Sequence, residues 1–175
     1  GVAKKQALAG FKWLGSMEQL KAFNELTEPD ERSPWFQGVD LEYLHNFAET
    51  ELVLSGSVPD AVRSHFSIAQ NLLVYSWYFF PFRGTALFYS FVTMELALQI
   101  RLSEPKGNFR KMLREAIDQR LVVAEGFRIL EGKDNAFKEE FMKQFPDLAA
   151  DLRNVEPHGE MLFTPSGFWS LRNAV

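Results

Sequence analysis

Arg153, Asn154 and His158 form the one cluster in this sequence whose residue types and spacing point to chemistry. An arginine can hold an anionic oxygen with its rigid fork of N–H donors, and an asparagine can orient a neighbouring group. Histidine titrates near neutral pH, so it can both accept and release protons. Together these groups favour a phosphodiester as the ligand.

The same residues also allow a purely structural interpretation. Arg153 could instead pair with Asp147 or Asp151, and His158 could close a helix end, where a cation is stabilised by the helix dipole. An arginine followed five positions later by a histidine is weak evidence alone. The asparagine directly after the arginine and Gly159 directly after the histidine make the string more specific.

Glu95 stands in a long and mostly apolar stretch of the chain. Desolvation of an unpaired carboxylate is costly, so we expect a cation or hydrogen-bond donor to meet it. In a structural interpretation that partner is Arg83 or Arg101, or Glu95 lies at an exposed edge of its helix. In a functional interpretation Glu95 supports Arg153 or His158 and fixes its orientation.

The hydrophobic spacing predicts helices that would position these residues. Asp40 and Asn108 are predicted to cap two of them, Pro59 suits the first turn of a third, and Pro146 is expected to break a late helix. Leu121–Val123 could form a short strand, but the helical segments around it favour an all-α bundle in one domain, residues 1–175. The seven expected helical segments cover residues 2–26, 40–54, 59–80, 85–102, 109–119, 135–152 and 164–175.

Composition excludes several classes of protein. The chain has no cysteine and only three histidines, so we expect no disulfide, no metal and no cofactor, and a cytoplasmic location. The turn at residues 81–84 and the charge of Glu95 interrupt the run of about 20 apolar residues that a membrane span needs, so no membrane is expected.

The net charge is −4, and residues 1–60 carry 5 basic against 10 acidic groups. Any contact with RNA must therefore be local.

The arginine, asparagine and histidine, with the apolar helix that carries Glu95, resemble the HEPN family, the higher-eukaryote and prokaryote nucleotide-binding domains. The resemblance covers about the last 100 residues. It implies an up-and-down helical bundle in which residues 61–175 form an HEPN-like core and residues 1–60 an N-terminal helical extension. It also implies a homodimer whose paired motifs face one another.

The resemblance implies one of two functions. The first is a metal-independent endoribonuclease in which Arg153 and His158 are catalytic and Asn154 and Glu95 support them. RNA supplies its own nucleophile, the 2′-hydroxyl, so the protein need only provide a proton carrier and a cation. The second is a non-catalytic module that binds a nucleotide or a protein, such as the partner of a nucleotidyltransferase in a toxin–antitoxin or defence system. Glu156 and Pro157 depart from an ideal phosphate site, because the first repels anions and the second lacks an N–H.

Overall fold

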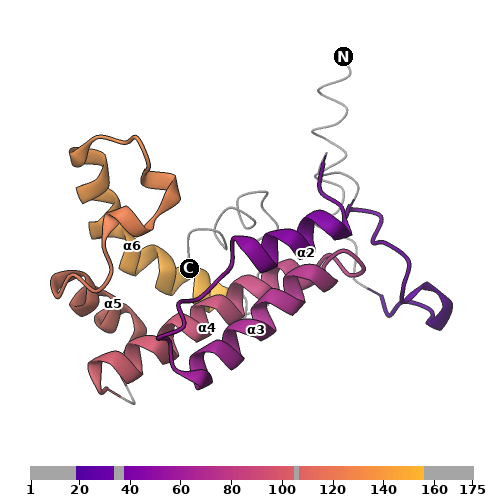
Figure 1. Ribbon diagram of the computed structural model, residues 1–175, viewed down its shortest axis with the longest axis horizontal. Helices are drawn as coiled ribbons and strands as arrows, with labels where there is room; N and C mark the ends of the chain where they lie inside the picture. Colours follow the sequence, from indigo (N-terminus) through magenta and orange to yellow (C-terminus); the bar gives the residue numbers. More distant parts are fainter. Residues whose placement is uncertain (1–18, 34–37, 105–106, 156–175) are drawn as a thin grey trace.

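The computed structural model describes residues 19–33, 38–104 and 107–155 (Figure 1). Within these residues it contains five α-helices and no strand, which confirms the predicted all-α class. The helices are α2 (Leu41–Thr50), α3 (Asp60–Tyr75), α4 (Phe82–Leu102), α5 (Phe109–Asp118) and α6 (Asn135–Val155). Most of the expected helix over residues 2–26, the expected helix over residues 164–175, and His158 lie outside the described residues.

Helices α3 and α4 form the predicted central hairpin and lie side by side along most of their length (Figure 1). Pro59 and Pro81 stand at their N-caps, where a proline fits because no helical N–H is needed there. Helix α3 ends at Tyr75, before the expected Phe80, and α4 begins at Phe82, before the expected Thr85. Among the described helices none is both long and apolar enough to cross a membrane.

Helix α2 packs on α3 and belongs to the same buried core. The carboxylate of Asp40 accepts a hydrogen bond from the Tyr43 N–H, as expected of a helix cap. The helix ends at Thr50 instead of continuing to residue 54, and Leu52 then turns back into the core with 1% exposure. The residues that α2 and its end bury are Leu44, Phe47, Ala48 and Leu52.

Helices α5 and α6 pack against each other and against α4. Asn108 caps α5 as predicted, through a hydrogen bond from the Lys111 N–H to its side-chain oxygen. The segment between α5 and α6 contains two 3₁₀ turns, and the alternative of a strand at residues 121–123 is wrong. A cluster of three aromatic rings, Phe127, Phe141 and Phe145, holds this segment against α6, with centroids 4.8 Å apart for Phe127 and Phe145.

Pro146 does not break α6, which contradicts the break expected from the sequence. Proline removes one helical N–H donor, which here would have bonded the carbonyl of Met142. Packing offsets this loss, because Pro146 is fully buried and its neighbours Phe145, Ala149 and Ala150 are buried too. The unbroken helix extends to Val155, so its last turn carries Arg153 and Asn154.

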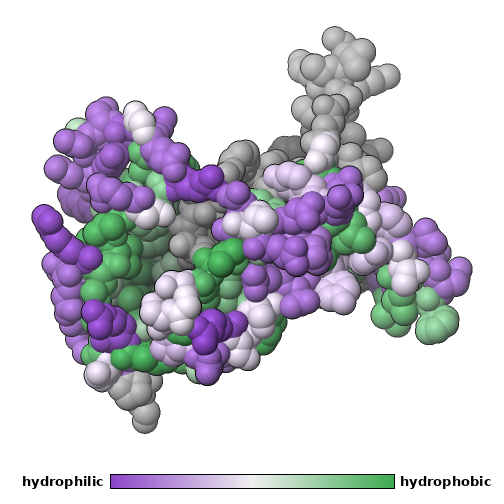
Figure 2. All heavy atoms as spheres, viewed as in Figure 1, coloured by the Kyte–Doolittle hydropathy of each residue, from purple (hydrophilic) through white to green (hydrophobic). Residues whose placement is uncertain are grey.

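The N-terminal segment that precedes α2 differs from its prediction. Residues 19–26 contain only a 3₁₀ turn, Phe23–Glu25, and not the end of a long helix. Leu20 and Phe23, the two described residues that were expected on the buried face of this helix, are open to solvent, with 96% and 90% exposure. This segment forms a projection with apolar atoms on its surface, seen at the right of Figure 2. Periodicity alone predicted a helix, but no described element packs on its apolar side.

Candidate functional site

Arg153 and Glu95 form an ion pair that joins the end of α6 to α4. The Nη2 atom of Arg153 lies 2.7 Å from Oε2 of Glu95, and its Nε donates to the same oxygen at 3.0 Å. The side chains are 33% and 17% exposed, so the pair is only partly shielded from water. Of the two structural partners considered for Glu95, neither is used, and Arg153 meets its carboxylate instead.

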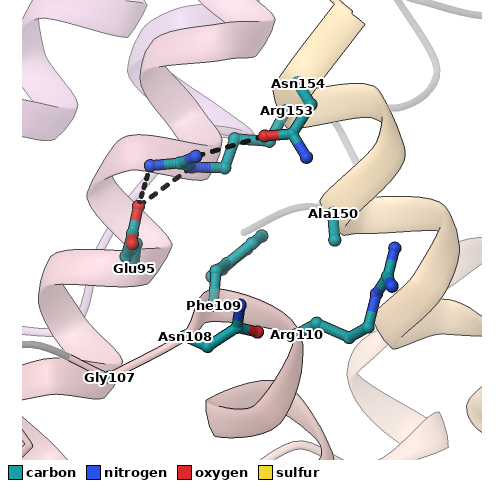
Figure 3. A pocket seen from close by; sticks show the side chains of 8 residues that line it. All are labelled: Glu95, Gly107, Asn108, Phe109, Arg110, Ala150, Arg153 and Asn154. Carbon is teal, nitrogen blue, oxygen red and sulfur yellow. Dashed lines mark hydrogen bonds and ion pairs between the residues drawn. The ribbon is translucent and has the colours of Figure 1, made fainter.

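The ion pair forms one side of a small pocket of about 270 Å³ (Figure 3). Arg110 lies on the other side, and the side chains of Phe109 and Ala150 lie between the two arginines. The pocket is lined by residues from three helices and the turn before α5: Glu95, Gly107, Asn108, Phe109, Arg110, Ala150, Arg153 and Asn154. The site thus lies where α4, the start of α5 and the end of α6 meet.

Asn154 accepts a hydrogen bond from Nη1 of Arg153 at 3.3 Å, so the two residues of the motif interact directly. A guanidinium has five N–H donors, and three of them are used toward Glu95 and Asn154. The other two have no acceptor within the part of the chain that the structure describes. Arg153 is therefore held in place and still able to donate to a ligand.

Asp147 and Asp151, the alternative partners of Arg153, bind other arginines. Arg110 lies 3.0 Å from Asp147 through Nε and 2.9 Å from Asp151 through Nη2. Arg114 donates to both oxygens of Asp147 at 2.9 and 3.0 Å. Arg153 thus does not pair with Asp147 or Asp151, because the arginines of α5 provide the cations for these two aspartates.

Arg110 is a pocket residue that the sequence interpretation missed. The signal was present, because the arginines of α5 and the aspartates of α6 each stand four positions apart and so lie on one face of their helices. The first turn of α5 also borders the pocket and brings the positive end of its helix dipole there. Two arginines line the pocket, and both are ion-paired, Arg153 with Glu95 and Arg110 with Asp147 and Asp151.

A second polar cluster at the turn between α3 and α4 lies apart from this pocket. Nε and Nη2 of Arg32 each bond one oxygen of Asp30 at 2.8 Å, and the N–H of Phe80 donates to the same carboxylate at 3.0 Å. Burial opposes ionisation of Asp30, but these hydrogen bonds outweigh it and hold its pKa below the ordinary value. Burial lowers the pKa of Arg83 to about 10, and the charge of Asp30 partly opposes that shift. Arg83 thus belongs to this cluster.

The chain matches no known protein-family model, no curated protein and no solved structure. Of the four residues that the sequence singled out, the structure brings three together, namely Glu95, Arg153 and Asn154. His158 lies outside the described residues. The chemistry of the site therefore has to be argued from the pocket itself.

Proposed function

We propose that this protein binds RNA through a phosphate site centred on Arg153 and cleaves it as an HEPN-like, metal-independent endoribonuclease. The observation that supports the proposal most is the partly exposed guanidinium of Arg153, held by Glu95 at the edge of a pocket that a second arginine, Arg110, also lines. A fixed guanidinium binds phosphate better than a mobile one, because less side-chain entropy is lost on binding.

The pocket suits one phosphate group and not a long stretch of backbone. Its volume is about 270 Å³, and the cations that line it are Arg110 and Arg153. Two aspartates pair with Arg110 and one glutamate with Arg153, and two N–H groups of Arg153 have no acceptor among the described residues. The amide of Asn154 and the start of α5 add polar groups that favour an anion. Arg153 is thus the main phosphate ligand in this proposal.

Cleavage needs a proton carrier in addition to a cation. The 2′-hydroxyl of RNA attacks the adjacent phosphorus, the bond to the 5′-oxygen breaks, and the products are a cyclic phosphate and a free 5′-hydroxyl. In this proposal Arg153 stabilises the negative charge that develops on the phosphorane. His158 removes the proton from the attacking hydroxyl, and His158 of a second copy protonates the leaving oxygen.

Glu95 is a positioning residue in this mechanism. It does not touch the phosphate, and its carboxylate would repel an anion if it faced the pocket without its partner. Both contacts from Arg153 go to one of its oxygens, Oε2, so the guanidinium charge compensates the carboxylate locally. The pair thereby fixes the direction in which Arg153 presents its remaining donors.

Equilibrium binding to a labelled single-stranded RNA tests the phosphate site. Loss of one charge-assisted contact costs roughly 1.5–3 kcal/mol, so Arg153→Ala should weaken binding by about 10- to 100-fold. It should also reduce the slope of log affinity against log salt concentration by about one, as expected for the loss of one phosphate contact. Arg114→Ala is the matched control, because Arg114 is an exposed arginine of α5 outside the pocket lining. Equal losses in the two variants would contradict the proposal.

Binding and cleavage can be separated. If the wild-type protein binds RNA through Arg153 but does not cleave it, the phosphate site is supported and the nuclease activity is excluded. That result would favour the non-catalytic nucleotide-binding module that the resemblance also implies. If the wild-type protein binds no RNA through this pocket, both the phosphate site and the nuclease activity are excluded.

A further inference from the structure

A second, larger hollow lies between α2 and α3, away from the phosphate pocket. Its volume is about 650 Å³, within the range of roughly 300–1,000 Å³ that is usual for ligand sites. Apolar side chains of both helices, Leu41, Ala48 and Val74, contribute to its lining. None of its lining residues is shared with the phosphate pocket, so the two sites are independent.

The two carboxylates of this groove pair with no lysine or arginine of the described residues. Glu42 and Glu49 line it from α2, which contains no lysine or arginine. Neither forms an ion pair with a lysine or arginine among the residues that the structure describes. The nearest titratable partner is His45, whose Nδ1 lies 3.6 Å from Oε2 of Glu49. Other acids near these helices are paired: Glu51, just after α2, pairs with Arg128, and Asp147 and Asp151 of α6 pair with arginines of α5.

Aromatic rings add a second feature that favours a cation. Tyr75 and Tyr78 line the groove, and Tyr75 is 56% exposed although it is a large aromatic residue. The face of such a ring attracts lysine and arginine side chains, and exposed tyrosines are common among the residues that dominate protein interfaces. The visible surface over α2 is mainly hydrophilic (Figure 2). The groove itself is lined by both apolar and acidic side chains.

We propose that this groove binds a basic segment of a partner protein. Lysine or arginine side chains of that segment pair with Glu42 and Glu49 and lie over Tyr75, while their aliphatic parts contact the apolar wall. Charge complementarity gives the groove its selectivity, because two carboxylates that no described lysine or arginine compensates repel the phosphates of RNA. The protein would then hold a protein partner on α2 and α3 and a phosphate at the junction of α4, α5 and α6.

Fluorescence anisotropy with a short labelled peptide of alternating lysine and alanine tests this proposal on the full chain. The double variant Glu42→Gln/Glu49→Gln should weaken binding by about fivefold, as expected for two exposed ion pairs. Tyr75→Leu should weaken it by about threefold through loss of the cation–π contact. The matched control is Glu131→Gln/Glu139→Gln, which removes the same charge from exposed positions outside the groove.

The expected result is weaker binding in the two groove variants and unchanged binding in the control, with equal thermal unfolding midpoints. The proposal is overturned if the wild-type chain does not bind the peptide, or if the control loses as much affinity as the groove variant. It is also overturned if a peptide with glutamate in place of lysine binds equally well. A groove variant that loses RNA binding and keeps peptide binding would instead identify the groove as an RNA surface.

Discussion

The Nη2 atom of Arg153 lies 2.7 Å from Oε2 of Glu95, although 58 positions separate the two residues in the chain. The contact fastens the end of α6 to α4 and places an arginine at the edge of a pocket. Because the pair is only partly buried, its attraction is not cancelled by full desolvation. It therefore both stabilises this junction and orients the guanidinium.

A double-mutant cycle measures the strength of this pair. We expect Glu95→Ala and Arg153→Ala each to lower the free energy of unfolding by about 1–3 kcal/mol, since each leaves a partly buried charge without its partner. The double variant should lose less unfolding free energy than the two single variants lose together. The difference, measured by urea unfolding, should be about 1–2 kcal/mol. The combination of Glu95→Ala with Arg114→Ala should be additive, and a coupling of similar size there would show that the effect is not specific to the pair.

Glu95→Gln separates positioning from binding. The amide keeps the size of the side chain but loses the charge that holds Arg153. The looser hold on Arg153 weakens RNA binding, and the loss of a negative charge beside the phosphate site strengthens it, so RNA affinity should stay within about threefold. The cleavage rate should fall by at least tenfold, because the guanidinium is no longer fixed in the reactive geometry. Parallel affinity and single-turnover measurements check this. A variant that cleaves like the wild type would reject the positioning role.

Gly107 borders the pocket at a point where a side chain does not fit. A Cβ atom built there would lie 2.6 Å from Sδ and 2.8 Å from Cγ of Met112, which is completely buried. Gly107→Ala must therefore displace Met112 and should cost about 1–3 kcal/mol, the usual range for overpacking. Gly126→Ala is the matched control, because open space surrounds its Cβ position. Unfolding in urea should show a loss in the first variant only.

Asp30 should make the fold sensitive to acid. Its pKa is lowered in the folded protein, so its stabilising contribution is complete above the ordinary value of 3.8 and is lost as the pH falls through the depressed folded pKa. At neutral pH, Asp30→Asn should cost about 3 kcal/mol, because Arg32 and Arg83 lose the carboxylate that compensates them. The difference between wild type and variant should shrink as the pH drops below 3.8. A constant difference across this range, measured by urea unfolding, would exclude the proposed linkage.

Local signals in the sequence predicted much of the helical framework. Asp40 and Asn108 cap α2 and α5 as expected, since a cap depends on one side chain and the nearest N–H groups. Where tertiary packing competes with a local rule, the sequence misled. Pro146 was expected to break α6 but is accommodated in a buried position, and the apolar residues Leu20 and Phe23 do not form a buried helix face.

The candidate site was predictable only in part, for a similar reason. A charge in an apolar stretch must find a partner, so Glu95 could be identified as important from the sequence. Which cation meets it depends on how α4 and α6 cross, and no local pattern specifies that crossing. Arg110 was missed because its contribution arises from the packing of α5 on α6, where it pairs with Asp151 and shares Asp147 with Arg114.

Cleavage of a single-stranded RNA in the presence of EDTA tests the central claim most directly. The wild-type protein should cut the RNA and should leave an otherwise identical strand with 2′-deoxyriboses intact, because the 2′-hydroxyl is the nucleophile. Arg153→Ala and His158→Ala should each reduce the rate by at least about 100-fold, while Arg114→Ala should cut like the wild type. Cleavage that persists undiminished in both Arg153→Ala and His158→Ala, or an equal loss in Arg114→Ala, would contradict the account.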